Sequence, residues 1–238
     1  MRIIFVRHGH PNYRKDCLTE LGHLHAAAAA ERLANEGIEQ IFSSTCGRAY
    51  ETAEYTARKL GITDIVKCDF MREVSWKSID DSELPFGGHP WQTANQIVAD
   101  GERLLDADWM HKEPYCRNIV TGIVQNIEQS FDVLLSDFGY KREGSYYRVL
   151  ANTETTIAVF SHGGSSSAML GHLLNLPFPF MCEAMPPDYT AVTVITICGE
   201  VDSLVSPKVE LFNDARHIAG ISLESTEATL TKEKVFSL

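Results

Sequence analysis

Short apolar runs alternate with segments of helical character along most of this chain, and this alternation restricts the fold more than any other feature. Runs of this length, bounded by turn residues, are typical of buried strands. Strands that alternate with helices usually pair in parallel, with helices on both faces of the sheet. We therefore expect an α/β fold of three layers, α/β/α, with a mostly parallel sheet of about six strands. The expected strands span residues 2–7, 38–43, 64–69, 155–161, 189–198 and 207–213.

Three segments between these strands carry helix signals. The stretch TELGHLHAAAAAERLANEG repeats leucine and alanine near helical spacing. It starts after Thr19, a suitable N-cap, and stops at Gly37. Two further helices are expected, one over 47–60 and one that begins just after His162-Gly163-Gly164 and runs to about Asn175.

The region from about 75 to 147 interrupts the alternation. It opens with an irregular stretch rich in Pro and Gly and then contains two expected helices, at 92–110 and 117–136, separated near Pro114. No linker follows it, and its own core would be small. Residues 1–238 are therefore interpreted as a single domain with a helical insertion that lies against the sheet. A separate domain is the alternative.

The C-terminal part departs from strict alternation. AVTVITI and KVELFN are separated by a turn region that contains Gly199, and they are interpreted as antiparallel edge strands. The polar segment from Ser222 onward is expected to be loosely held.

Charge and hydropathy exclude several classes of protein. The formal net charge of −11 opposes binding to nucleic acid and to anionic membranes, because both depend on clustered Lys and Arg. The N-terminal apolar stretch is too short for a secretory signal before Arg7 interrupts it. No later stretch reaches the roughly 18 apolar residues that a membrane-spanning helix needs. A soluble, cytoplasmic protein is expected.

Two histidines far apart in sequence are expected to meet at one edge of the sheet. His8 ends the first strand in IIFVRHGH, and His162 ends another in TIAVFSHGG. In an open α/β sheet, ligands bind just beyond the carboxyl ends of the parallel strands. The sequence therefore predicts a site that contains both imidazoles.

Two arginines make this site suitable for binding an oxyanion. Arg48 lies in the first turn of the helix expected over 47–60, where a cation costs roughly 0.3–1 kcal/mol unless it faces an anion. The helix N-terminus itself favours an anion. Arg7 supplies a second planar set of donors suited to phosphate or carboxylate. We interpret the site as an oxyanion pocket.

His8 is the candidate nucleophile if a phosphoryl group enters this pocket. Nearby cations would lower the imidazole pKa below its ordinary value of about 6.5, which keeps a lone pair available at neutral pH. His162, when protonated, would add positive charge beside the arginines. The leaving alkoxide needs a proton, and Glu73 in FMREVSW is the candidate donor at the mouth of the crevice.

These residues stand in motifs that resemble those of one family. Arg7-His8-Gly9, LTELG, SSTCGRAYETA, Glu73 and SHG, in this order, are similar to the motifs of the histidine phosphatase superfamily. That superfamily includes cofactor-dependent phosphoglycerate mutases and many small-molecule phosphatases. The similarity extends, with gaps, from residue 2 to about 175.

The resemblance implies a role for each matching residue. It implies that His8 becomes phosphorylated, that Glu73 is the proton donor and that His162 completes the catalytic set. The phosphate-binding residues that it implies are Arg7, Arg48, His162 and, through its backbone N–H, Gly163.

The residues after the first motif depart from the family pattern. Many members have an acidic residue or Gln directly after RHG and an Asn some positions later, whereas this chain has His10 and then Asn12, Tyr13 and Arg14. The differences fall on the substrate-facing rim, for which His10, Asn12 and Arg14 are the candidates.

The insertion at about 75–147 is expected to supply part of the substrate wall. Its three tryptophans are interpreted as packing residues, because the acidic composition argues against a platform for stacked bases. They are Trp76, Trp91 and Trp109.

Two other chemistries are weighed against this interpretation. A metal site built from His8, His10 and His162 would place a cation beside Arg7 and Arg48, with no Asp or Glu within the motif to hold it. The six cysteines contain no C-x-x-C pair, which disfavours zinc and favours reduced thiols. HGGSSS resembles a serine-esterase oxyanion loop, but no G-x-S-x-G sequence is present. We expect neither metal nor cofactor.

The function predicted from the sequence is a metal-independent phosphatase that acts on a small phosphomonoester through a phosphohistidine. A mutase that returns the phosphate to another hydroxyl is one alternative. A phospho-ligand binding protein without turnover is the other. The expected partner is a small phosphorylated metabolite, with neither nucleic acid nor membrane, and a homodimer is left open.

Overall fold

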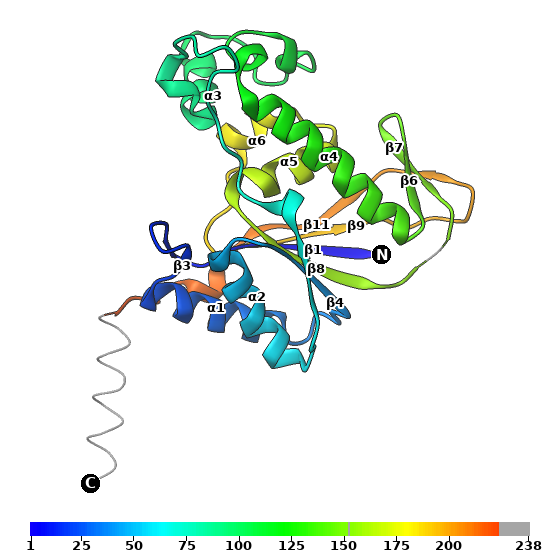
Figure 1. Cartoon of the computed structure of the whole chain (residues 1–238). Coiled ribbons are helices and arrows are strands. Elements are labelled where there is room, and N and C mark those ends of the chain that lie inside the picture. The colour runs from blue at the N-terminus through cyan, green and yellow to red at the C-terminus, as the bar shows by residue number, and fades with distance from the viewer. Residues whose placement is uncertain (152, 224–238) are drawn as a thin grey trace.

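A six-stranded sheet with helices on both faces forms the centre of the molecule (Figure 1). The computed structural model describes residues 1–151 and 153–223. The strand order is β11-β9-β1-β8-β4-β5, with parallel pairing from β1 to β5 and antiparallel pairing of β9 with β1 and β11. The predicted fold class and mostly parallel sheet are confirmed. The strands are β1 (Arg2–Arg7), β4 (Gln40–Ser44), β5 (Ile65–Cys68), β8 (Thr156–Ser161), β9 (Val192–Thr196) and β11 (Lys208–Asp214).

Alternating side chains of β1 divide the core between the two faces of the sheet. Ile3 and Phe5 pack with the layer of α4 and α5, and the Phe5 ring centroid lies 5.8 Å from that of Phe131. Ile4 and Val6 point the other way, toward α1 and α2. The helices are α1 (Glu20–Leu33), α2 (Gly47–Leu60), α3 (Pro90–Ala99), α4 (Ile119–Asp137), α5 (Gly163–Leu174) and α6 (Phe178–Ala184).

The helix boundaries follow the local signals where those signals are strong. The Thr19 hydroxyl accepts the N–H of Gly22 and caps α1. Helix α2 ends at Gly61, which has a φ of +69°, the left-handed conformation that glycine adopts without strain. The strand pair predicted at the C-terminal end is also present as β9 and β11, although only β11 is an edge strand.

The insertion is less helical than predicted. Helix α3 ends at Ala99 and not at 110, because the chain turns at Gly101, whose φ is +73°. Beyond α4, a hairpin of β6 (Tyr140–Glu143) and β7 (Tyr146–Val149) closes the region, and β10 (Leu204–Val205) pairs with β7. The turn between β6 and β7 contains Gly144, and strands of four residues each are too short to show a clear alternation.

Two expectations concern the chain ends and the membrane. The prediction for the segment from Ser222 onward falls almost entirely on 224–238, outside the described residues.

Within residues 1–151 and 153–223, no helix is long and apolar enough to cross a membrane.

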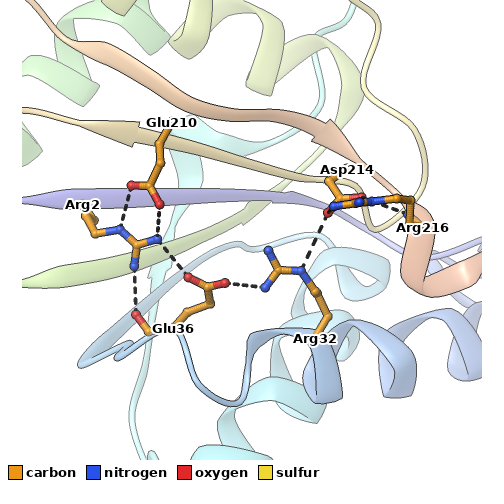
Figure 2. Close-up of polar contacts among 6 residues, drawn as sticks. All are labelled: Arg2, Arg32, Glu36, Glu210, Asp214 and Arg216. Carbon is orange, nitrogen blue, oxygen red and sulfur yellow. Dashed lines mark hydrogen bonds and ion pairs between the residues drawn. The ribbon is translucent and has the colours of Figure 1, made fainter.

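An ion-pair network joins β1, the end of α1 and β11 on the side of the sheet covered by α1 (Figure 2). Arg2 Nη2 lies 2.8 Å from Glu210 Oε1 and 2.9 Å from Glu36 Oε2. Arg32 also pairs with Glu36, and its Nε lies 3.8 Å from Asp214 Oδ2. Glu36 is therefore shared by two guanidinium groups from different elements, which holds the end of α1 against the sheet.

We expect Glu36→Gln to lower the free energy of unfolding at neutral pH by about 1–3 kcal/mol, between the values for exposed and buried pairs. Burial acts to raise the pKa of Glu36, but hydrogen bonds from Arg32 and Arg2 outweigh it, so the pKa lies below its ordinary value of 4.5. A carboxylate with a lowered pKa stabilises the fold above the unfolded-state pKa, and this contribution is lost as pH falls through the folded-state pKa.

Urea unfolding between about pH 7 and about pH 3 measures this effect. The wild type should lose stability on the acid side more steeply than Glu36→Gln. Glu31→Gln is the matched control, because the Glu31 pair with Lys59 is exposed. Parallel pH curves for Glu36→Gln and the wild type would rule the linkage out.

Candidate active site

The two histidines predicted from the strand ends meet at the carboxyl edge of the sheet. His8 follows β1 and His162 follows β8, and these strands pair in parallel with Arg7 opposite Ser161. The His8 N–H donates to the Ser161 carbonyl at 3.0 Å. The two imidazole centroids lie 5.1 Å apart, and both side chains are fully buried. Parallel pairing therefore brings residues more than 150 positions apart into one site.

The surroundings of His8 determine which nitrogen is free. Nδ1 lies 2.7 Å from the Gly9 carbonyl oxygen, which can only accept, so Nδ1 carries the hydrogen. Nε2 accepts from Arg48 Nε at 3.3 Å and holds the lone pair. Burial, with the charges of Arg7 and Arg48, lowers the pKa of His8 to about 3. His8 is therefore neutral above that pH, with Nε2 as its nucleophilic atom.

His162 is held in one orientation by Ser44. The Ser44 hydroxyl accepts the N–H of Cys46 at 3.2 Å and lies 2.8 Å from His162 Nε2. The tautomer of His162 decides which of these two atoms donates the hydrogen, because a hydroxyl oxygen can accept two hydrogen bonds as well as donate one. Burial and the charge of Arg48 lower the pKa of His162 well below its ordinary value. A lowered pKa favours the neutral imidazole of His162 in this state.

Two buried nitrogens of the site have no hydrogen-bond partner in the described part of the chain. Arg7 Nη1 donates to the Pro187 carbonyl at 2.7 Å, and the guanidinium stacks 4.4 Å from the centroid of the Tyr189 ring. Among the described residues, neither Arg7 Nε nor His162 Nδ1 has a hydrogen-bond partner, although both are buried. Buried polar atoms are nearly always satisfied, so this pair suits an anionic ligand.

The anion that Arg48 requires in the first turn of α2 is partly supplied by the protein. Asp16 Oδ2 accepts the N–H of Gly47 at 2.9 Å, and Asp16 Oδ1 pairs with Arg48 Nη1. This carboxylate at the helix N-terminus offsets the unfavourable placement of the cation. The sequence argument expected only a bound anion there, because nothing local pairs Asp16 with a residue 32 positions away.

Glu73 lies at the N-terminus of α5, beside His162. Its Oε1 accepts three backbone N–H groups, at 2.8 Å from Gly164, 3.0 Å from Val74 and 3.3 Å from Ser165. Burial raises the pKa of Glu73 in spite of these bonds and of the charge on Arg7. Since Oε1 is occupied as an acceptor, the hydrogen of a protonated Glu73 belongs on Oε2.

A cavity of about 280 Å³ lies next to the site, and among the described residues His8, Arg48 and His162 are not part of its lining. Arg7, Glu73 and Gly163 contribute to it from the carboxyl edge of the sheet, and three residues of the insertion face them. Its lining residues are Arg7, Tyr13, Glu73, Trp76, His89, Trp91, Gly163, Pro186 and Pro187.

The candidate rim residues lie elsewhere. His10 Nδ1 is 2.9 Å from the Thr19 hydroxyl, and the Asn12 side chain accepts the N–H of Lys15. In the described part of the chain, His10, Asn12 and Arg14 are not among the residues that line the cavity. Tyr13, between Asn12 and Arg14, does line it, with its ring centroid 5.4 Å from the guanidinium carbon of Arg48.

The tryptophans of the insertion divide between two roles. Trp109 is buried and packs against Tyr115 with ring centroids 5.0 Å apart, as a packing residue. Trp76 and Trp91 also pack against the core, and in addition they line the cavity. Tyr189 is a further residue that the sequence argument missed, because its ring reaches Arg7 and His8 from a loop far along the chain.

Gly164→Ala is expected to lower kcat/KM by about 100-fold, because a displacement of about 1 Å at a reacting group has an effect of that size. A Cβ at Gly164 would lie 2.7 Å from Glu73 Oε1 and 2.4 Å from Val74 Cγ2, so Glu73 must move. Steady-state kinetics measure the loss. Gly122→Ala in α4 is the control, since nothing lies within 4 Å of its Cβ. Full activity of Gly164→Ala would mean that the position of Glu73 does not matter.

The alternative of a metal centre finds no support in the grouping of side chains. Across residues 1–151 and 153–223, no three or more His, Cys, Asp or Glu side chains are grouped so that they could hold a metal ion. His8 and His162 instead face the guanidinium groups of Arg7 and Arg48.

Comparison with known proteins gives a partial family match and a common fold. Residues 3–86 match the model of the histidine phosphatase superfamily, branch 1. This confirms the resemblance inferred from the motifs. No curated protein sequence matches the chain.

Several solved structures share the fold. A mycobacterial glucosyl-3-phosphoglycerate phosphatase is 22% identical with a TM-score of 0.59, covering 89% of this chain and 98% of that one. A phosphoserine phosphatase from Entamoeba histolytica is 19% identical with a TM-score of 0.58, covering 91% and 98%. A protein described as a putative alpha-ribazole-5'-P phosphatase from Escherichia coli is 18% identical with a TM-score of 0.59, covering 90% and 98%. At these identities the likeness concerns the fold.

Proposed function

We propose that this chain, whose residues 3–86 match the histidine phosphatase superfamily, is a metal-independent phosphatase that hydrolyses a small phosphomonoester through a phosphohistidine at His8. The observation that carries the proposal is a buried His8 with a lowered pKa, whose ring centroid lies 5.1 Å from that of His162, together with two buried nitrogens that have no partner among the described residues, Arg7 Nε and His162 Nδ1. The names of the structurally similar proteins, several of them phosphatases, support the same reaction class.

The first step transfers the phosphoryl group to the protein. His8 Nε2 attacks phosphorus, the bond between phosphorus and the alcohol oxygen breaks, and its electron pair stays on that oxygen. Glu73 Oε2 donates its proton to this oxygen, so the product leaves as a neutral alcohol. Arg7, Arg48 and His162 donate to the phosphoryl oxygens, where their fixed positions stabilise the developing charge.

The second step returns the protein to its starting state. Water attacks the phosphohistidine, the bond between His8 Nε2 and phosphorus breaks, and the lone pair returns to Nε2. The Glu73 carboxylate takes one proton from that water and is ready for the next cycle. Inorganic phosphate then leaves the pocket. Glu73 alternates between acid and base, for which a raised pKa is suited.

The proposal is tested with p-nitrophenyl phosphate in the presence of EDTA. Turnover together with an acid-labile phosphate on the protein is the expected result. Tight binding of phosphate esters without turnover would favour a binding protein. Transfer of the phosphate to a second hydroxyl compound in place of water would favour a mutase. A cytoplasmic location and a single domain over 1–238 stay predictions.

A further inference from the structure

Three aromatic rings of the insertion form a continuous wall on one side of the cavity. Trp76 and His89 have ring centroids 4.6 Å apart, His89 and Trp91 5.5 Å, and Trp76 and Trp91 6.2 Å. These separations lie in the range of favourable edge-to-face packing, so the rings hold one another in place. We call Trp76, His89 and Trp91 the aromatic wall.

The aromatic wall stands directly beside the reacting groups. An atom placed as a Cβ on Gly163 would lie 3.7 Å from Trp91 Cζ2 and 3.7 Å from Arg7 Nε. A Cβ placed on Gly164 would lie 3.1 Å from Trp91 Cη2 and 2.7 Å from Glu73 Oε1. Trp91 and the Glu73 carboxyl group therefore lie next to each other at the N-terminus of α5, and both line the cavity.

The charged residues around the cavity already have roles in the proposed mechanism: Arg7 binds the phosphoryl group and Glu73 transfers the proton. Of the described residues that line it, only Arg7 and Glu73 carry a charged group. Burial lowers the pKa of His89, so its imidazole is neutral at neutral pH. The remaining surface consists of Trp and Tyr rings with Pro186 and Pro187. A second anionic group on the substrate would lose water here without gaining a cation.

We propose that the preferred substrate is the phosphomonoester of an uncharged alcohol that carries a planar ring, and that the aromatic wall selects this ring. The inference rests on the proposed function and specifies its substrate class. The phosphoryl group lies against Arg7 and His8, the ester oxygen faces Glu73, and the ring packs on Trp91 and Trp76. A volume of about 280 Å³ suits a compact molecule of this kind.

The test compares three alkyl phosphates whose ester oxygens have similar chemistry. These are 2-phenylethyl phosphate with a ring, ethyl phosphate without one, and O-phosphoserine with extra charges. We expect kcat/KM for 2-phenylethyl phosphate to exceed that for ethyl phosphate by about tenfold or more, the size of one buried ring contact. O-phosphoserine should be the poorest of the three.

Variants of the aromatic wall show whether these rings cause the preference. Trp76→Leu and Trp91→Leu should each reduce the ratio of kcat/KM for 2-phenylethyl phosphate to that for ethyl phosphate by about fivefold to tenfold. The ratio separates recognition of the ring from any general damage to the site. Tyr146→Leu, which removes an exposed ring on β7, is the control and should leave the ratio unchanged.

The outcomes distinguish this inference from the function on which it rests. Preference for O-phosphoserine, or a ratio that both tryptophan variants leave intact, would overturn the substrate class while the phosphatase activity stands. Absence of turnover with all three esters and with p-nitrophenyl phosphate would overturn both.

Discussion

Replacement of His8 by alanine is expected to lower kcat for p-nitrophenyl phosphate by about 10⁴-fold or more, because the nucleophile of a covalent mechanism has no substitute in the site. His162 does not replace it, since its Nε2 is already engaged by Ser44. Wild-type protein quenched during turnover should carry one acid-labile phosphate. His8→Ala should carry none.

Controls separate loss of the nucleophile from loss of the fold. His8 is fully buried, so thermal unfolding of His8→Ala must show a folded protein at the assay temperature. His111→Ala removes a highly exposed histidine of the insertion and should retain activity and labelling. Substantial turnover by folded His8→Ala, or a phosphate that stays on it, would falsify the assignment of the nucleophile.

Glu73→Gln is expected to slow alcohol release from ethyl phosphate by about 10²–10⁴-fold in a single turnover. The glutamine oxygen can still accept the N–H groups of Val74 and Gly164, so α5 and its N-terminus keep their positions. What is lost is the proton on Oε2. With p-nitrophenyl phosphate, whose phenol is acidic and leaves as an anion, the same step should slow by less than about tenfold.

The pH dependence provides a second readout of Glu73. The acid form is the proton donor, and burial raises its pKa above the ordinary value of 4.5. The rate of alcohol release from ethyl phosphate should therefore fall as pH rises through that raised pKa. Protonation of His8 does not lower this rate in the same pH range, because the pKa of His8 is about 3. If Glu73→Gln keeps the same alkaline limb, another group supplies the proton.

Much of the fold could be predicted because its signals are local. Thr19 and Gly61 mark helix boundaries through backbone bonds and φ preferences that involve only neighbouring residues. The buried strands are apolar on both faces, which makes them continuous runs in the sequence. The insertion was predicted less well, because the two-residue turn at Gly144 joins strands too short to show a clear alternation.

The residues of the candidate site also fall into two groups, those that local sequence signals identified and those that they did not. His8, Arg48 and His162 were found because each follows a strand whose carboxyl end could be recognised. Asp16 and Ser44 were missed, because each acts on a partner that only folding brings near. The aromatic wall was missed for a related reason, since a tryptophan that lines a cavity has the same local sequence as one in a core.

The sequence by itself determined which chemical groups stand at the carboxyl ends of the strands, because strand ends and helix starts depend on neighbouring residues. Only the tertiary structure decided that burial is the largest cause of the lowered pKa of His8 and His162 and that burial raises the pKa of Glu73. Protonation depends on burial and on hydrogen bonds from segments far apart in the chain. The tertiary structure also decided what faces the phosphoryl site, where the insertion contributes a wall of uncharged rings.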